Sequence, residues 1–135
     1  MNEHNARNRA GERRLLQACV ALGALVPIAG GAAGVLLGPN MVEGNAFIPA
    51  IDSHFRYLSG LLFGIGVAFW STVPSIEVKG ARFRLLTALI VAAGLGRLAG
   101  LIATGAPSRY LIAWLIMELA ITPLLCLWQA RIARA

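Results

Sequence analysis

The sequence is poor in charged residues, in acids and in cysteine. Of its 135 residues, 13% are charged and 58% are hydrophobic, whereas soluble domains carry about 25% charged residues. A soluble fold of this composition would expose far too much apolar surface, which excludes an ordinary soluble domain. Cys19 and Cys126 are not part of any paired Cys/His spacing, so the sequence predicts no metal site and no other cofactor.

What the sequence does contain is four long apolar runs. Because about 20 apolar residues are needed to cross ~30 Å of hydrocarbon, these runs predict transmembrane helices at about residues 15–37, 53–73, 84–104 and 110–128. The predicted fold class is all-α, an integral membrane bundle of four antiparallel helices in up-and-down order. Residues 15–130 form this domain, between a polar basic tail at 1–14, expected to be loose or at the membrane surface, and a basic tail at 131–135.

The first apolar run has a competing interpretation as a cleaved signal peptide, because its flank is basic. Residues 15–37 are 23 positions without a charge, whereas the apolar part of a signal peptide has about 7–15 residues. The length favours a helix that is retained in the mature protein. Pro27 lies inside this run and should kink the helix, since proline removes a backbone donor.

The basic residues are distributed in clusters. The chain has 12 Lys and Arg against 6 acids, and nine of the 12 lie in three clusters beside apolar segments: Arg7, Arg9, Arg13 and Arg14; Lys79, Arg82 and Arg84; Arg131 and Arg134. A basic groove for nucleic acid is the alternative, but the tendency of positive residues to stay in the cytoplasm explains the clusters without one. We expect both termini to be cytoplasmic, in a bacterial inner membrane, with no nucleic-acid partner.

Three positions should set the limits or the shape of the helices. Asp52 or Ser53 is expected to cap the second helix, because short polar side chains bind exposed N–H groups at helix starts. Pro74 should end that helix, and Pro123 should bend the fourth helix one turn below Glu118.

Two opposite charges lie inside neighbouring apolar runs. Arg97 is about seven residues from the outer end of the third helix, or ~10 Å, and Glu118 is about eight residues into the fourth, or ~12 Å. The short connection between the helices makes them antiparallel neighbours. Because a single charge in hydrocarbon costs about 2.5–3.5 kcal/mol or more, the sequence predicts that Arg97 and Glu118 are paired.

A cluster of polar residues is expected between this pair and the outer face of the membrane. Arg56 lies one turn into the second helix from the outside, together with Asp52, His54 and Tyr57. One interpretation is a purely structural ion pair that fixes helix register. The other is a site open to the outer face, in which the arginines receive an anionic or carbonyl-bearing ligand with Glu118 as counter-charge. A proton relay through Glu118 is a variant of the second.

Glycines recur at intervals of four residues at Gly30, Gly34 and Gly38 in the first apolar run and its end, and in pairs on two further predicted helices. Gly60 and Gly64 form one pair, and Gly96 and Gly100 form the other. Small residues at this spacing allow helix backbones to approach closely in lipid. The sequence predicts helix packing at these four positions, either within the bundle or, less favoured, at a dimer face.

Several short strings stand at characteristic places: residues 52–60, followed by Gly64 and Gly66; residues 96–100, followed by Gly105 and Pro107; and Glu118. Together they resemble a small bacterial family of four-helix membrane proteins classed as a domain of unknown function. The resemblance covers about residues 15–130 and departs from the family pattern at Ser53 and His54. The overall plan is also similar to DoxX-like membrane proteins. Both resemblances imply a fold and key residues but no activity.

Three functions remain open at this point. The favoured one is a non-enzymatic membrane protein that binds a small lipophilic or anionic molecule, or a lipid head group, near Arg56, Arg97 and Glu118. The second is an accessory or assembly subunit, with a partner membrane protein or a second copy docked on the glycine faces. The third is a quinone- or lipid-handling membrane enzyme, ranked last because the sequence shows no nucleophile, metal cluster or acid–base pair.

The charge clusters generate a prediction of topology. A reporter fused at Ala135 should report the cytoplasm, and a reporter fused after Asn45 should report the outer side, because basic residues stay inside. A cytoplasmic signal from the Asn45 fusion would reject this orientation.

Overall fold

The computed structural model describes residues 3–41, 48–105 and 109–134, and all regular elements in these ranges are helices. The elements in chain order are α1 (Glu3–Leu37), a short turn at Gly38–Met41, α2 (Pro49–Trp70), a second short turn at Val73–Ser75, α3 (Gly80–Thr104), α4 (Arg109–Ile116), a π-helical turn η3 (Met117–Ile121) and α5 (Thr122–Arg134). The parts of the predicted outer connections at 42–47 and 106–108 lie outside the described residues.

Four of the described helical segments are long and apolar enough to cross a membrane. They are Arg7–Met41, Pro49–Ser75, Gly80–Thr104 and Arg109–Arg134. Large apolar side chains along them are exposed, including Leu22, Leu85, Ile102 and Leu127, as expected where lipid is the solvent. The all-helical class is confirmed, and so is the presence of four helices long and apolar enough to span a membrane. The orientation of the termini stays a prediction.

The helices begin at other residues than the sequence predicts. Helix α1 already begins at Glu3, so residues 3–14 are helical, and their place at the membrane surface stays a prediction. Alanine, arginine and glutamate in this stretch are good helix formers and no proline interrupts them. Arg13 also forms an ion pair with Glu77 at 3.1 Å. The helix continues through Pro27.

The starts of α2 and α3 also differ from the predictions. Helix α2 begins at Pro49, after Ile48, and no side chain caps it. The prediction that Asp52 or Ser53 caps this helix is therefore wrong, because proline's fixed backbone angle suits the first helical position and places the start three residues earlier. Helix α3 begins at Gly80, four residues before the predicted start, and ends at Thr104 as predicted.

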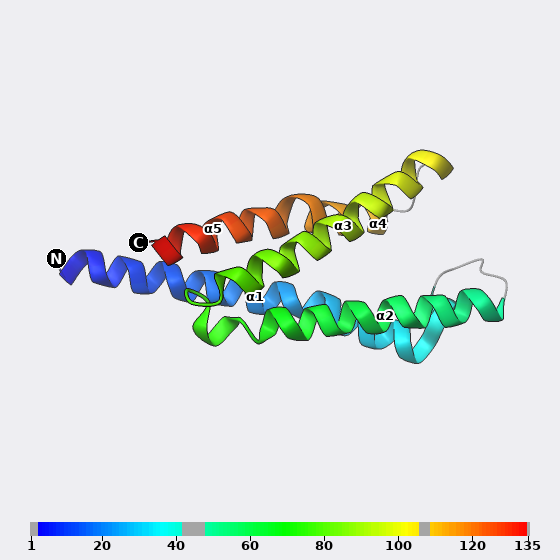
Figure 1. Cartoon of the computed structure of the whole chain (residues 1–135), viewed down its shortest axis with the longest axis horizontal. Helices are drawn as coiled ribbons and strands as arrows, with labels where there is room; N and C mark the ends of the chain where they lie inside the picture. Colours follow the sequence, from blue (N-terminus) through cyan, green and yellow to red (C-terminus); the bar gives the residue numbers. More distant parts are fainter. Residues whose placement is uncertain (1–2, 42–47, 106–108, 135) are drawn as a thin grey trace. The chain divides into compact units, whose positions relative to one another are not determined.

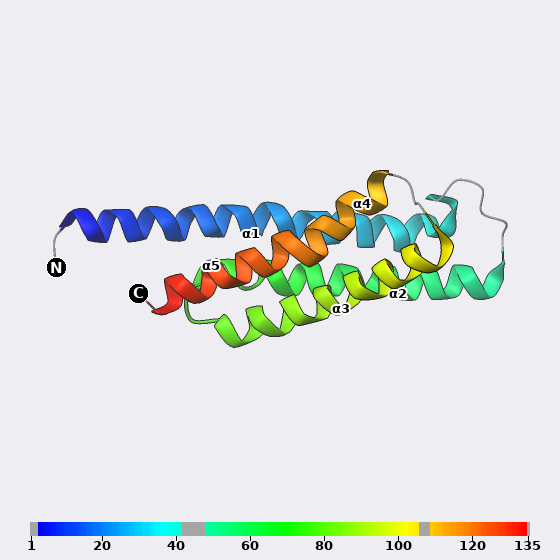
Figure 2. The ribbon, with the colours of Figure 1, turned by 90° about the horizontal axis from the view of Figure 1, so that it is seen from above.

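The chain divides into two compact units, and each is described by itself. The first unit comprises residues 1–17 and 74–135, and the second comprises residues 18–73. The second unit contains most of α1 and all of α2, and the first contains the start of α1 with α3, α4, η3 and α5. Figures 1 and 2 show α3 beside α5, and the two helices run antiparallel.

Close backbone contacts hold α1 against α2 in the second unit. A methyl group added at Gly31 would lie 2.7 Å from the carbonyl oxygen of Ser59, and one added at Gly66 would lie 2.9 Å from the backbone nitrogen of Ile28. Residue numbers rise along one helix as they fall along the other, so the helices are antiparallel. Small residues therefore pack these helices, and Gly34, whose added Cβ would meet the side chain of Ser59, contributes to the same contact.

The first unit has its most completely buried side chains near the start of α3. Leu16, Ile76, Phe83 and Gln129 are all at most 1% exposed. Gln129 lies near the end of α5 and donates a hydrogen bond of 2.7 Å to the carbonyl oxygen of Ile76. This bond ties the last helix to the segment that precedes α3.

The α1–α2 contact generates a stability prediction. Gly31→Ala should destabilise the protein by about 1–3 kcal/mol, because the new methyl group meets backbone atoms that cannot rotate away. The matched control is Gly23→Ala in the same helix, where the methyl group meets nothing within 4 Å and should stabilise by about 0.5–1 kcal/mol. Thermal unfolding in detergent measures both. Equal effects of the two substitutions would contradict the predicted contact.

Candidate functional site

The pair predicted from the sequence is formed within the first unit. Arg97 on α3 donates from Nε to Oε2 of Glu118 at 3.0 Å and from Nη2 to Oε1 at 3.0 Å. Both carboxylate oxygens are used, in the two-pronged geometry that favours arginine–carboxylate pairs. The side chain of Glu118 is 8% exposed and that of Arg97 is 34% exposed. The pair therefore buries the acid, while the arginine side chain stays partly exposed.

Glu118 lies in a π-helical turn and not in a regular α-helix. In η3 the backbone N–H and the hydroxyl group of Thr122 both donate to the carbonyl oxygen of Met117, the latter at 2.8 Å. Pro123 follows directly; it lacks an N–H and its ring would clash with the carbonyl group four residues earlier in an α-helix. The wider turn removes that conflict. Such turns are frequent at functional sites.

A glycine lets α3 approach this turn closely. A methyl group added at Gly94 would lie 2.9 Å from Cβ of Glu118 and 2.8 Å from Cδ2 of Leu119. Arg97 comes three residues after Gly94, so the two lie on the same face of α3. Gly94 thus sets the distance at which the arginine reaches the carboxylate.

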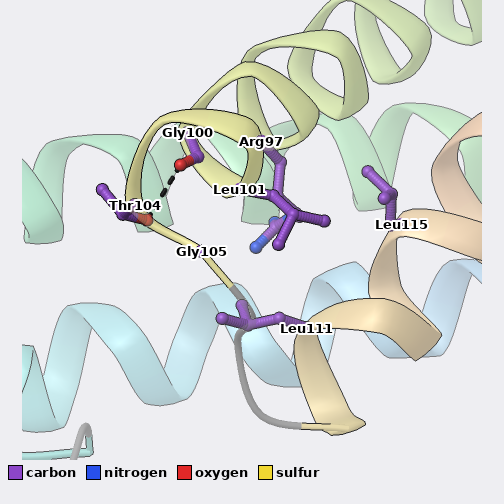
Figure 3. Close-up of a pocket in the computed structure, with 7 residues that line it drawn as sticks. All are labelled: Arg97, Gly100, Leu101, Thr104, Gly105, Leu111 and Leu115. Carbon is purple, nitrogen blue, oxygen red and sulfur yellow. Dashed lines mark hydrogen bonds between the residues drawn. The ribbon is translucent and has the colours of Figure 1, made fainter.

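A pocket of about 350 Å³ adjoins Arg97. It is lined by residues of α3 and of the turn that follows, and by two leucines of α4: Arg97, Gly100, Leu101, Thr104, Gly105, Leu111 and Leu115. Figure 3 shows the side chains of Leu111 and Leu115 across the pocket from α3, with the nitrogen atoms of Arg97 directed into the space between. The lining is therefore apolar apart from Arg97 and Thr104.

The other predicted arginine is used differently, within the second unit. Arg56 donates from Nε and Nη2 to the two oxygens of Asp52, at 2.9 and 3.2 Å, and from Nη1 to the carbonyl oxygens of Val35 and Leu36. These carbonyl groups belong to the last turn of α1, where helix oxygens lack partners. Arg56 therefore closes the end of α1.

The turn after α1 is shaped to receive this side chain. Gly38 has a φ of 64°, which favours glycine, and a methyl group there would lie 2.6 Å from Nη2 of Arg56 and 2.7 Å from Oδ1 of Asp52. The rings of His54 and Tyr57 lie 6.2 Å apart on the same helix. Arg56, Asp52, His54 and Tyr57 thus belong to one unit and the Arg97–Glu118 pair to the other. A joint site of both groups stays a prediction.

Sequence reasoning missed three features of the site. It did not identify Gly94, because the pattern of spacing selected Gly96 and Gly100 instead. It did not identify the π-helical turn, although Pro123 indicated a distortion nearby. It also missed the leucines of the pocket, since leucine in a membrane span carries no signal by itself. Among the described residues, no three His, Cys, Asp or Glu side chains gather in a group that could hold a metal ion.

The fold and the buried pair define a class, that of small helical membrane proteins with four spanning segments. The particular family follows from residues 15–129, which match the family model DUF4345, described as a domain of unknown function; the chain belongs to this family. The resemblance to such a family is therefore confirmed, and the similarity to DoxX-like proteins is not. No curated protein and no solved structure matches the chain.

The geometry of the pair predicts that removing Arg97 and removing Glu118 destabilise the protein by different amounts. Arg97→Met leaves the buried carboxylate of Glu118 without a partner and should cost about 3–5 kcal/mol. Glu118→Leu should cost less, because the guanidinium of Arg97 is partly exposed. The double variant should be more stable than Arg97→Met alone. Unfolding of all three in detergent measures this, and losses that simply add would show that the residues are not coupled.

Proposed function

We propose that this membrane protein is non-enzymatic and binds a small lipophilic or anionic molecule in the pocket beside Arg97. The observation that carries the proposal is the Nη1 group of Arg97, which donates to no residue that the structure describes, while Nε and Nη2 are held by Glu118. A charged donor directed into an apolar pocket is the usual means by which such a pocket orients a ligand.

The size and the lining of the pocket support the same proposal. Its volume of about 350 Å³ falls within the range of about 300–1,000 Å³ that is usual for small-molecule sites. Leu101, Leu111 and Leu115 supply apolar surface, and the ion pair supplies a fixed polar end. Ionisable residues inside membrane spans are themselves associated with function.

The two arginines receive different roles in this proposal. The hydrogen bonds of Arg56 go to Asp52 and to the end of α1, so its role is to hold α1 and α2 together. Arg97 is the ligand-binding residue, and Glu118 fixes its orientation. If the predicted topology holds, the pocket lies in the outer half of the membrane.

Two glycines of α3 provide a matched test. Gly100 is among the residues that line the pocket and Gly96 is not, while a Cβ added at either position would meet no other atom within 4 Å. Gly100→Val should therefore lower the amount of bound small molecule roughly tenfold, as filling a site costs about 1–3 kcal/mol. Gly96→Val should leave it unchanged.

The measurement is native mass spectrometry of the full chain, released gently from its membrane in lipid nanodiscs. Wild type and Gly96→Val should carry a small molecule beyond the bulk lipid, and Gly100→Val should carry little. Equal amounts of bound small molecule on all three proteins would reject the pocket as a binding site. A protein subunit retained in fixed proportion, with no small molecule, would favour the accessory-subunit function instead.

A further inference from the structure

The charge balance of the pocket restricts what it can hold. Arg97 is the only charged side chain among the described residues that line it, and the carboxylate of Glu118 already matches that charge. An anionic or cationic occupant would bring an uncompensated charge into apolar surroundings, which is unfavourable. A neutral occupant leaves the balance unchanged.

The charged hydrogen-bonding groups of the pocket are donors, and beside them the hydroxyl oxygen of Thr104 can still accept a bond. Nη1 of Arg97 has no partner among the described residues, so the pocket offers donors there. Both oxygens of Glu118 accept bonds from Arg97, and the hydroxyl group of Thr104 donates to the carbonyl oxygen of Gly100 at 2.9 Å. The available donors come from Arg97, so the matching group on an occupant is an acceptor oxygen.

The volume indicates how much of an occupant the pocket holds. At about 30 Å³ for each non-hydrogen atom, the volume that one water molecule takes in the liquid, the pocket of about 350 Å³ holds roughly a dozen such atoms. Beyond the acceptor end, the occupant meets Leu101, Leu111 and Leu115. The remainder of the molecule is therefore hydrocarbon.

We infer that the ligand is a neutral lipophile of about a dozen non-hydrogen atoms, whose carbonyl oxygen accepts a hydrogen bond from Nη1 of Arg97. This inference rests on the proposed function and decides between its two ligand classes. It assigns the lipophilic class and excludes free carboxylates. The ion pair then serves as a neutral donor: Glu118 cancels the charge of Arg97 and leaves its outer N–H groups available.

The test compares four probes of matched size: 2-undecanone, dodecane, decanoate and undecylammonium. Each is equilibrated with the full chain in nanodiscs of zwitterionic lipid, and empty nanodiscs correct for partition into lipid. The ketone should bind about ten- to a hundredfold more tightly than the alkane, as expected for a hydrogen bond to a charged donor. It should also bind more tightly than the carboxylate and the ammonium.

Two variants complete the test. In the double variant Arg97→Met/Glu118→Leu, which removes the pair without leaving a lone charge, the ketone and the alkane should bind equally. Gly100→Val should weaken the binding of every probe that occupies the pocket. Preference for decanoate or undecylammonium, or a ketone preference that survives the double variant, would overturn this inference alone. Absence of any binding that depends on Gly100 would overturn it together with the proposed function.

Discussion

The ion pair between Arg97 and Glu118 is the interaction on which the site depends. Either charge alone in hydrocarbon is energetically costly. The two residues must therefore lie at the same depth in the membrane, with α3 close to the π-helical turn. Gly94 permits the short range, because any side chain there would meet Glu118 and Leu119. The π-helical turn before Pro123 carries the carboxylate to the arginine. The need to pair two charges in an apolar environment thus explains both the glycine on α3 and the irregular turn that carries Glu118.

Arg56 and Arg97 both lie in spanning segments, and their hydrogen bonds offset the cost of a charge there in two different ways. Arg56 is 39% exposed, yet its donors are directed to Asp52 and to two carbonyl groups of α1. Arg97 is exposed to a similar extent, at 34%, but its hydrogen bonds go to one carboxylate on one side. Exposure therefore does not distinguish a structural arginine from a candidate ligand-binding one. The number of its N–H groups that remain without a partner does.

The sequence predicted those features that follow from composition and from counting along helices. Four apolar runs gave the four spans, and equal depths on adjacent helices gave the Arg97–Glu118 pair, which the structure forms. It did not predict where α2 begins, because Asp52 has the chemistry of a cap but is used by Arg56. It did not predict that the first helix reaches back to Glu3. In both cases residues nearby in the sequence decide where the helix begins: Pro49 and Arg56 for α2, and the helix-forming residues 3–14 for α1.

The glycines show most clearly what a sequence pattern leaves undecided. Four-residue spacing predicts that Gly60, Gly64, Gly96 and Gly100 pack helices, and across the whole bundle this stays a prediction. Within each unit, the close backbone approaches are at other positions, such as Gly31 and Gly94, while the Cβ positions of Gly96 and Gly100 meet nothing within 4 Å. Spacing identifies which residues share a face of a helix, but it does not show whether another helix packs against that face. At Gly100 the missing side chain leaves room in the pocket, so glycine allows a close helix contact at one position and an open space at another.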